Sequence, residues 1–438
     1  MIQWRKVRLG EIVTVKHGYA FPSEFFQEDP PGDILLTPGN FAVGGGFKGE
    51  KFRYYRGGPV PSEFVLKSGD LLVTMTDLSK SGDTLGYPAL VPPLDGRRFL
   101  HNQRLGLVQV TVPSAVDKVF LYYALHSEAY RHEVLASATG STVRHTSPSR
   151  IQAYEFSIPP LQEQTRIATV LSAIDEKIEL NRKTNETIEA MERALFKSWF
   201  VDFDPVRAKM DGRAPVYMDT GTAALFPDSL FETEGALLPK GWSTLRLDDE
   251  VSFLNGLALQ KSPAAEGEPF LPVIKIAQLR TGNSEGADRA NLTVPTSHRI
   301  DDGDLIFSWS GSLMIRLWVG GPGALNQHLF KVTSSTFPRW FVHGWLRHHL
   351  PEFQAIAADK ATTMGHIQRH HLTEAKIVVP SADVLEKAGS LIAPLEEQLI
   401  QNDKERRTLR ELRDELLPRL LSGEFRVRET ERVVEAAV

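Results

Sequence analysis

Two long stretches of the chain carry hydrophobic residues at helical spacing. Residues 161–199 contain no Gly or Pro, and residues 384–421 show a similar stripe further on. The stripes consist of Ile167, Leu171, Ile174, Ile178, Ile188, Met191, Leu195 and Trp199 in the first, and of Leu391, Leu395, Leu399, Leu409, Leu412, Leu416 and Leu420 in the second. Steps of three and four predict amphipathic helices. At about 1.5 Å per residue the first would span about 58 Å, and a helix that long needs a partner surface.

Polar residues interrupt both stripes at seam positions, namely Asn181, Asn185 and Asn402. A buried Asn in a helix pair costs stability but sets register and orientation. We therefore expect the two helices to pack together as an antiparallel coiled coil, with these residues setting the register. The alternative is that each helix packs on its own domain. Pro394 is expected in the first turn of the second helix or at a kink, and Pro418 at a frayed or kinked end.

The segments before the two helices resemble each other. Residues 4–20 align without gaps with residues 242–258, and further matches follow in the same order. The matching landmarks are Trp4/Trp242, Arg8/Arg246, Leu9/Leu247, Val13/Val251, Gly18/Gly256, Ala20/Ala258, Asp70-Leu71-Leu72/Asp304-Leu305-Ile306, Asn102-Gln103/Asn326-Gln327, His145/His366 and Ile158-Pro159/Val379-Pro380. An ordered series of matches indicates an internal repeat rather than chance similarity between two β-rich domains.

Each repeat combines short strand-like runs with one helical stretch. Alternating and glycine-bounded apolar runs predict strands, and residues 119–135 and 339–357 are helix-like. The fold class is therefore α+β: two related domains with small mixed sheets, separated by the two long helices. The expected boundaries are 1–158 for the first domain, 159–200 for the first helix, 201–238 for a connector, 239–380 for the second domain, 381–424 for the second helix and 425–438 for a tail.

Composition narrows the class of protein. Hydrophobic residues make up 42% and charged residues 24%, which is ordinary for a globular chain. The chain has no cysteine, which excludes disulfides and thiolate metal ligands. No apolar run approaches the roughly 18 residues of a membrane span, and the N-terminus lacks the pattern of a signal peptide. We expect a cytoplasmic protein with no membrane partner. The net charge of −5 argues against a generic DNA-coating protein.

Two motifs carry a family resemblance. The first runs from Ile158-Pro159-Pro160-Leu161-Gln162-Glu163-Gln164 into the helix that ends Ala194-Leu195-Phe196-Lys197-Ser198-Trp199-Phe200-Val201-Asp202-Phe203-Asp204-Pro205-Val206. The second comprises Leu225-Phe226-Pro227-Asp228-Ser229 and Pro239-Lys240-Gly241-Trp242. Both closely resemble the central region of Type I restriction–modification specificity subunits. The second helix departs from the family pattern: Val379-Pro380-Ser381 opens it, and Glu396-Glu397-Gln398 arrives late, which leaves its start open.

The resemblance implies a division of labour. Each domain would be a target recognition domain that reads one half of a split site in double-stranded DNA. The helices would fix the spacing and dock two methyltransferase subunits, and restriction subunits would add translocation and cleavage. This chain would hold no cofactor, because S-adenosylmethionine, ATP and Mg²⁺ are expected on the partner subunits. It would therefore be a non-catalytic subunit.

Catalytic motifs are incomplete in the sequence. Asp29-Pro30-Pro31-Gly32 lacks the aromatic residue with which an adenine methyltransferase stacks a flipped base. The run Gly44 to Lys48 lacks P-loop spacing. Glu232 and Glu234 have no lysine two residues on, as a nuclease site would need. His366, His370 and His371 lie in a segment that reads as loop with no obvious third ligand, so no metal site is expected.

DNA contacts are expected where basic and amide side chains gather and acids are scarce. In the first domain these are Lys48, Lys51, Arg53, Tyr55, Arg56, Arg97, Arg98, Asn102, Gln103, Arg104, Arg144 and His145. In the second they are Lys275, Gln278, Arg280, Trp309, Arg316, Asn326, Gln327, His328, His366, Gln368 and Arg369. For the two Asn-Gln pairs, base reading and a shared structural hydrogen bond remain open alternatives.

Three other functions compete with DNA recognition. A fused methyltransferase or nuclease would need the missing motifs. A scaffold protein would use the helices for assembly and would lack basic loops. A specificity subunit of a methylation-only or phage-defence system would look the same in sequence.

Overall fold

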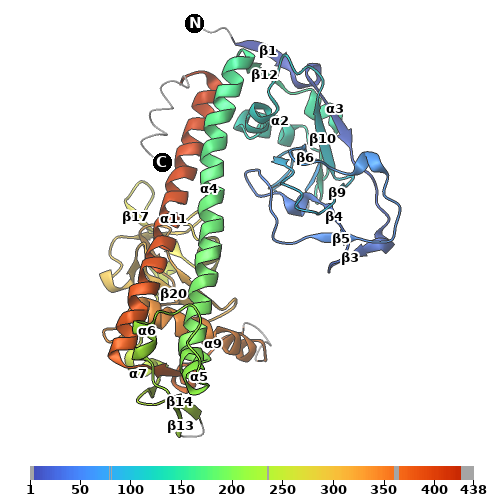
Figure 1. Ribbon diagram of the computed structural model, residues 1–438. Coiled ribbons are helices and arrows are strands. Elements are labelled where there is room, and N and C mark those ends of the chain that lie inside the picture. The colour runs from blue at the N-terminus through green and yellow to red at the C-terminus, as the bar shows by residue number, and fades with distance from the viewer. Residues whose placement is uncertain (1–3, 78, 80, 234–235, 360–364, 426–438) are drawn as a thin grey trace. The chain divides into compact units, whose positions relative to one another are not determined.

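The computed structural model describes residues 4–77, 79, 81–233, 236–359 and 365–425 (Figure 1). The chain forms two compact units. Unit 1 comprises residues up to Glu176 together with those from Leu409 on, and unit 2 comprises Lys177–Thr408. Each unit holds one α+β domain and one portion of a long helix pair, so the predicted fold class is confirmed. Within the described ranges, no helix has the length and apolar character that crossing a bilayer demands.

The first domain, residues 4–158, contains two four-stranded sheets and two short strand pairs. One sheet has the order β2 (Val13–His17), β10 (Leu105–Val110), β6 (Leu71–Thr74) and β8 (Pro88–Leu90). The other has the order β3 (Phe26–Gln27), β5 (Arg53–Tyr55), β4 (Asp33–Leu36) and β9 (Phe99–His101). The pairs are β1 (Arg5–Arg8) with β12 (Glu155–Ile158) and β7 (Thr76–Asp77) with β11 (Arg144–His145). Its helices are α1 (Lys118–Ala124), α2 (Glu128–Ala136) and α3 (Pro148–Gln152).

The second domain, residues 243–379, repeats this plan. One sheet has the order β16 (Ser252–Asn255), β23 (Leu329–Thr333), β20 (Leu305–Ser308) and β21 (Met314–Leu317). The other has the order β18 (Arg289–Asn291), β17 (Phe270–Ile274), β22 (Gly323–Leu325) and β19 (Arg299–Ile300), and β15 (Ser243–Arg246) pairs with β24 (Lys376–Val379). Its helices are α7 (Leu247–Glu250), α8 (Ile276–Thr281), α9 (Arg339–Asp359) and α10 (Arg369–Glu374).

Strand pairing confirms the internal repeat. Among the strand pairs of the described residues, one in each domain is parallel: β4 with β9 in the first and β17 with β22 in the second. The matched sequences Leu71-Leu72 and Leu305-Ile306 lie on β6 and β20, which occupy the same place in their sheets. The helical stretch predicted at 119–135 is two short helices, because the chain turns at 125–127 and Ser127 caps α2.

The long helices are α4 (Leu161–Phe196), which continues as a π-helical turn over Lys197–Val201, and α11 (Ala382–Ser422). They lie side by side (Figure 1) and run antiparallel, because contacts in unit 2 pair rising positions on α4 with falling ones on α11. Asn181 Nδ2 donates to Glu405 Oε2 at 2.6 Å, and Asn185 Nδ2 donates to the Leu399 carbonyl at 3.1 Å. The expected antiparallel packing is confirmed.

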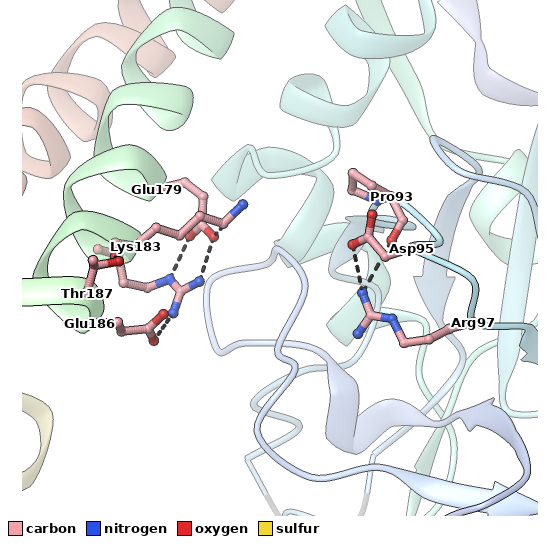
Figure 2. Close-up of polar contacts among 8 residues, drawn as sticks. Pro93, Asp95, Arg97, Glu179, Lys183, Glu186 and Thr187 are labelled. Atoms are coloured by element: carbon pink, nitrogen blue, oxygen red, sulfur yellow. Dashed lines mark hydrogen bonds and ion pairs between the residues drawn. The ribbon is translucent and has the colours of Figure 1, made fainter. Parts of the chain in front are cut away.

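The outer face of α4 carries exposed ion pairs between residues one turn apart. The Arg182 guanidinium donates to both oxygens of Glu179, at 2.8 and 2.7 Å, and also to Glu186 (Figure 2). Such pairs add a few tenths of a kcal/mol each. These ion pairs stabilise α4 itself and do not determine which helix packs against it.

The second helix begins next to its expected boundary at residue 381. α11 starts at Ala382, directly after Pro380-Ser381, and passes through Pro394 and Pro418 to Ser422. Placing Pro394 in the first turn was therefore wrong. Ile158 and Val379 are 221 positions apart, and so are Leu161 and Ala382, the first residues of the two helices. The Glu396-Glu397-Gln398 run is accordingly the counterpart of Asp175-Glu176-Lys177, not a delayed copy of Glu163-Gln164.

The motifs of the connector form one aromatic core in unit 2. Trp242 packs against three phenylalanines from the end of the helix and the connector: its ring centroid lies 6.1 Å from Phe200, 5.8 Å from Phe203 and 6.2 Å from Phe226. The connector also contains α5 (Asp204–Met210), α6 (Thr220–Leu225) and the hairpin of β13 (Leu230–Thr233) and β14 (Ala236–Pro239). These aromatic side chains continue into the core of the second domain, which explains their place in a motif.

Candidate nucleic-acid interface

The Asn-Gln pair of the first domain forms a turn directly after β9. Gln103 N donates to the Tyr19 carbonyl at 3.0 Å, and Asn102 Oδ1 accepts from Arg104 N at 2.9 Å. A Cβ on Gly18 would lie 2.1 Å from the Asn102 carbonyl oxygen, so this close approach requires glycine. The turn leaves Gln103 and Arg104 exposed at its tip.

The second domain builds the same turn after β22. Gln327 N donates to the Leu257 carbonyl at 3.0 Å, and Asn326 Oδ1 accepts from His328 N at 3.4 Å. A Cβ on Gly256 would lie 2.2 Å from the Asn326 carbonyl oxygen. The matched glycines of the sequence repeat thus share one structural cause.

The two turns distinguish between base reading and a structural role for the two asparagines. Asn102 is 8% and Asn326 is 3% exposed, and each side chain holds the backbone of its own turn. A buried side chain used in this way is not presented to a DNA groove. We therefore take both asparagines as structural, which leaves Gln103, Arg104, Gln327 and His328 as the residues that the turns present.

A short strand pair lies beside the turn in the first domain. β11 brings His145 against Thr76 of β7, and Thr76 Oγ1 lies 3.2 Å from His145 Nδ1. The backbone of Met75 joins this pair to the turn, because Met75 N donates to the Arg104 carbonyl at 2.8 Å and its carbonyl accepts from Thr146 N at 3.0 Å. Arg104, Arg144 and His145 are thus brought together. Thr76 was not predicted.

The second domain has the matching cluster around Ser310. His366 forms an isolated bridge with Ser310, and Ser310 Oγ lies 3.0 Å from His328 Nδ1. The Trp309 ring lies 6.2 Å from the His328 ring and 6.3 Å from the His366 ring. Trp309 Nε1 donates to Asn255 Oδ1 at 3.2 Å, which holds the indole in place. The structure therefore brings Trp309, His328 and His366 together, with Ser310 as a partner that sequence reasoning missed.

The missed hydroxyl residues share a position in the repeat. Thr76 and Ser310 each lie two residues beyond the Thr74 and Ser308 that end β6 and β20. A hydroxyl at that distance from the strand end is the only sequence signal for them. It is weak, because Ser and Thr are common at strand ends.

The basic loop of the first domain lies on the small sheet. Arg53 and Tyr55 are on β5, which pairs with β4, and Arg98 at the start of β9 forms an ion pair of 3.4 Å with Asp33 of β4. Lys48 pairs with Glu50 at 3.3 Å. In the part of the chain that is described, Lys51, Arg56 and Arg104 are exposed and form no ion pair, so they are the most available cations of this group.

Two residues of the first domain that were predicted as DNA contacts have side chains that bond within the domain instead. Arg97 folds back on its own turn (Figure 2): its guanidinium donates to the carbonyls of Pro93 at 3.4 Å and Leu94 at 3.2 Å, and to Asp95 at 3.3 Å. Tyr55 is 2% exposed, donates its hydroxyl to the Pro59 carbonyl at 3.3 Å and has a raised pKa because it is buried. Tyr55 is thus a core residue, and its prediction as a DNA contact does not fit its burial.

The predicted DNA contacts around α8 also divide into residues that bond within the domain and one that remains exposed. Gln278 is buried and donates to the Glu285 carbonyl at 3.3 Å, and Lys275 is paired with Asp288. Arg316 donates to the carbonyls of Leu279 at 3.1 Å and Arg280 at 2.8 Å, and burial lowers its pKa. Arg316 lines a cavity of about 730 Å³ instead of an open surface. Arg280 remains exposed at the end of α8.

Of the three histidines near the end of the second domain, His370 and His371 lie on a helix, whereas His366 precedes it. Gln368 precedes α10, and its N–H donates to His371 Nδ1 at 2.9 Å. Arg369 and His370 are exposed. Ligand atoms of His370, His371 and Glu374 lie within 4.8 Å of one another, so the third group that the sequence did not reveal is Glu374. The expectation of a loop was wrong because a one-turn helix has too short a pattern to recognise.

Comparison with known proteins gives consistent relatives. The family model described as Type I restriction modification DNA specificity domain matches residues 1–190. The Type I restriction enzyme MjaIX specificity subunit of Methanocaldococcus jannaschii is 28% identical over 97% of this chain and 94% of its own length. The HindI specificity subunit of Haemophilus influenzae is 23% identical over 70% of this chain and 77% of its own. In fold, the chain is similar to the crystal structure of a Type I restriction-modification system S subunit from M. genitalium, with a TM-score of 0.59, 18% identity and 96% of each chain covered.

Proposed function

The chain belongs to the family of Type I restriction enzyme specificity subunits, and from this premise we propose that it selects the DNA sequence on which a restriction–modification complex acts. Each domain is a recognition domain that reads one half of a bipartite site. The subunit itself carries out no chemistry. Its cofactor-dependent partners are two methyltransferase subunits, with restriction subunits as a further partner.

One observation carries this proposal: the two domains present the same polar site at the same place in the repeat. In each, an Asn-anchored turn carries a glutamine, exposed at Gln103 and half-buried at Gln327, near a histidine, His145 or His366. Gln reads adenine and Arg reads guanine through paired hydrogen bonds in the major groove. Two recognition turns of the same design, with different neighbouring side chains, would allow the chain to recognise two different half-sites.

The flanking residues differ between the domains, which supports two different half-sites. Arg104 of the first domain stands where the second has His328, and Trp309 of the second domain stands where the first has Met75. A guanidinium donates hydrogen bonds to base edges, while an indole and imidazoles offer stacking or apolar contact. We therefore expect the first half-site to contain guanine next to the bases read by Gln103.

The helix pair supports a fixed separation between half-sites. α4 has 36 residues and α11 has 41, and each is helical without interruption. Such helices are far stiffer than a flexible linker of the same length. Reading modules joined by a stiff element meet the duplex only at a defined phase of its helical turn. The helices would also carry the docking surface for the methyltransferase subunits.

Genome-wide mapping of methylated adenines, in cells with and without this gene, tests the proposal. We expect an interrupted two-part motif to disappear on deletion. Gln103→Ala with Arg104→Ala should relax one half of the motif and leave the other half and the spacing unchanged. Gln327→Ala with His328→Ala should do the reverse. An unchanged pattern, in cells shown to express the chain and its methyltransferase partner, would favour a scaffold that does not read DNA.

A further inference from the structure

The two domains and their helices can be compared residue by residue. α1 begins at Lys118 and α9 at Arg339, β12 begins at Glu155 and β24 at Lys376, and each pair is 221 positions apart. The helices α4 and α11 keep this separation, so residues 118–196 correspond without a gap to residues 339–417. Each residue where the first domain meets the helix pair therefore has one counterpart in the second domain.

In unit 1 the helix pair forms its own ion pair. Arg413 of α11 donates to Asp175 of α4 at 2.8 Å, and the Tyr123 hydroxyl of α1 donates to the second oxygen of Asp175, also at 2.8 Å. His126 lies next to Tyr123, with ring centroids 6.3 Å apart, and burial lowers its pKa to about 4. Tyr123, His126, Asp175 and Arg413 are called the first seat.

In unit 2 the counterparts are Gly344, Arg347, Glu396 and Glu192, called the second seat. Here both helices contribute an acid: Glu192 of α4 stands where α11 has Arg413 in the first seat. The helix pair therefore does not balance its own charge. Arg347 of α9 supplies a compensating positive charge, because its Nη1 lies 3.3 Å from Glu192 Oε2. Both acidic side chains, Glu192 and Glu396, are at most 6% exposed.

The partners of the second acid, Glu396, also come from α9. Arg339 Nε donates to Glu396 Oε2 at 2.7 Å, and His343 Nδ1 donates to Glu396 Oε1 at 3.0 Å. The charge that the first seat obtains from its own helices is thus supplied in the second seat by the domain that packs on it.

Shape differs between the seats as well as charge. Gly344 stands where the first domain has Tyr123, and a Cβ there would lie 2.3 Å from Phe196 Cε2. The Phe196 ring cannot easily move, because it packs against Phe200, Phe341 and Trp345 at centroid distances of 5.1, 6.2 and 5.4 Å. The counterpart of Phe196 on α11 is Leu417. The first helix of the first domain would therefore not fit the second seat.

We propose that the two seats act as an address that assigns each recognition domain to its own portion of the helix pair. The first seat accepts a helix that presents Tyr and His to a balanced acid–arginine pair. The second accepts a helix that presents Gly and Arg to two acids and Phe196. The order of the domains, and with it the order of the half-sites, follows from these eight positions. Only this last consequence rests on the proposed function.

A double-substitution cycle on the full-length chain tests the address without DNA. Arg347→His gives the second domain the residue of the first and leaves two acids under-compensated, so the melting midpoint of unit 2 should fall by about 5–10 °C. Glu192→Arg alone places a cation beside Arg347 and should also lower it. Together they recreate the histidine, acid and arginine of the first seat. The double variant should recover at least half of the loss caused by Arg347→His.

Controls separate this coupling from general damage. Arg347→Lys keeps the charge and should keep most of the midpoint, and Arg193→His removes an exposed cation next to Glu192 and should change little. The reciprocal pair, His126→Arg with Arg413→Glu, should show the same rescue in unit 1. If the Arg347→His variant is insoluble, the rescue is measured as the yield of soluble protein from the double variant.

Additive losses, or continued insolubility of the double variant, would overturn the address. That outcome is distinct from failure of the proposed function. An additive cycle in a chain that still directs methylation to its motif refutes the address alone, whereas a coupled cycle in a chain that directs no methylation refutes the DNA-recognition role alone.

Discussion

Asn402 Nδ2 donates a hydrogen bond to Asn185 Oδ1 at 2.8 Å across the helix pair, and both side chains are buried. Asn185 passes the contact on through Nδ2 to the Leu399 carbonyl. Asn402 Oδ1 in turn accepts from Gln398 Nε2 at 2.7 Å. Buried polar groups linked in this way favour the one register in which all of them are satisfied.

Asn402→Leu should therefore destabilise the chain by about 1–3 kcal/mol, because it leaves the Asn185 carbonyl oxygen without its partner in an apolar seam. Urea unfolding followed by circular dichroism measures this. The double variant Asn185→Leu with Asn402→Leu should lose less than the single one, because neither amide remains unpaired. Gln401→Leu, at the exposed neighbouring position, is the matched control. A double variant worse than the sum of its singles would contradict this account.

The packing of α9 against α4 gives a prediction with an unusual sign. Alanine normally stabilises a helix interior relative to glycine by about 1 kcal/mol. At Gly344 the added Cβ would meet the Phe196 ring, so we expect Gly344→Ala to lower stability by about 1–3 kcal/mol. Gly389, a helical glycine on α11 whose Cβ would meet only Trp340 at 3.3 Å, is a milder comparison. Thermal unfolding of the two variants decides whether the Phe196 contact is as tight as stated.

Long-period patterns in the sequence were sufficient for the fold class. The helical stripes, the order of the repeat and the three Asn seam positions predicted the helix pair and the paired domains, because periodicity and repetition are properties of the sequence alone. The place of Pro394 within α11 was harder to predict, because a proline usually marks a helix boundary or a kink, and here the helix continues through it. The separation of 221 positions between the two helices agrees with a start of α11 at Ala382.

The candidate interface was harder to predict at the level of single residues. Basic composition selected candidate loops, but it could not distinguish the exposed Arg104 from Arg97, whose guanidinium is already hydrogen-bonded. Only the fold shows that the Arg97 guanidinium is used by its own turn, and that Tyr55 fills the core instead of the surface. The hydrogen bonds of Arg97 and Tyr55 join residues only two to four positions apart, but they depend on the folded shape of each turn, which the residue pattern alone does not give.

This contrast between two arginines can be measured. In the assembled complex with methyltransferase subunits, Arg104→Ala should weaken binding to the cognate DNA by about 1–3 kcal/mol. Arg97→Ala should have a smaller effect, because its guanidinium already donates to the Pro93 and Leu94 carbonyls. Fluorescence anisotropy at fixed salt compares them. Equal losses for the two variants would mean that the Arg97 turn opens on DNA.

Lys51 and Arg56 are expected to contact phosphates instead of bases. Replacing either by Ala should weaken binding to all sequences alike and reduce the slope of log affinity against log salt by about 1. The isolated chain, with a net charge of −5, should bind DNA weakly at physiological salt. Nanomolar, sequence-specific binding by the purified subunit alone would contradict that expectation.

Glu192 makes stability depend on pH in a direction that can be worked out. Burial, with the nearby Glu396 carboxylate adding to it, raises the pKa of Glu192 from 4.5 to about 7, and Arg347 offsets only part of this. The folded chain therefore holds a proton on Glu192 between pH 4.5 and about 7 that the unfolded chain has released. Folding binds protons in this window, so the contribution of Glu192 to stability falls as pH rises through it.

Glu192→Gln removes this penalty, because glutamine mimics the protonated carboxyl at every pH. The variant and the parent should be equally stable near pH 4, and the variant should gain to about 2–3 kcal/mol above pH 7. Other titrating groups cancel in the difference, including His343, whose pKa burial lowers to about 4. Glu186→Gln, at an exposed position earlier on α4, is the control. Urea unfolding from pH 4 to 8 gives the difference curve, and a curve that is flat or falls with pH would show that Glu192 is ionised in the folded chain throughout.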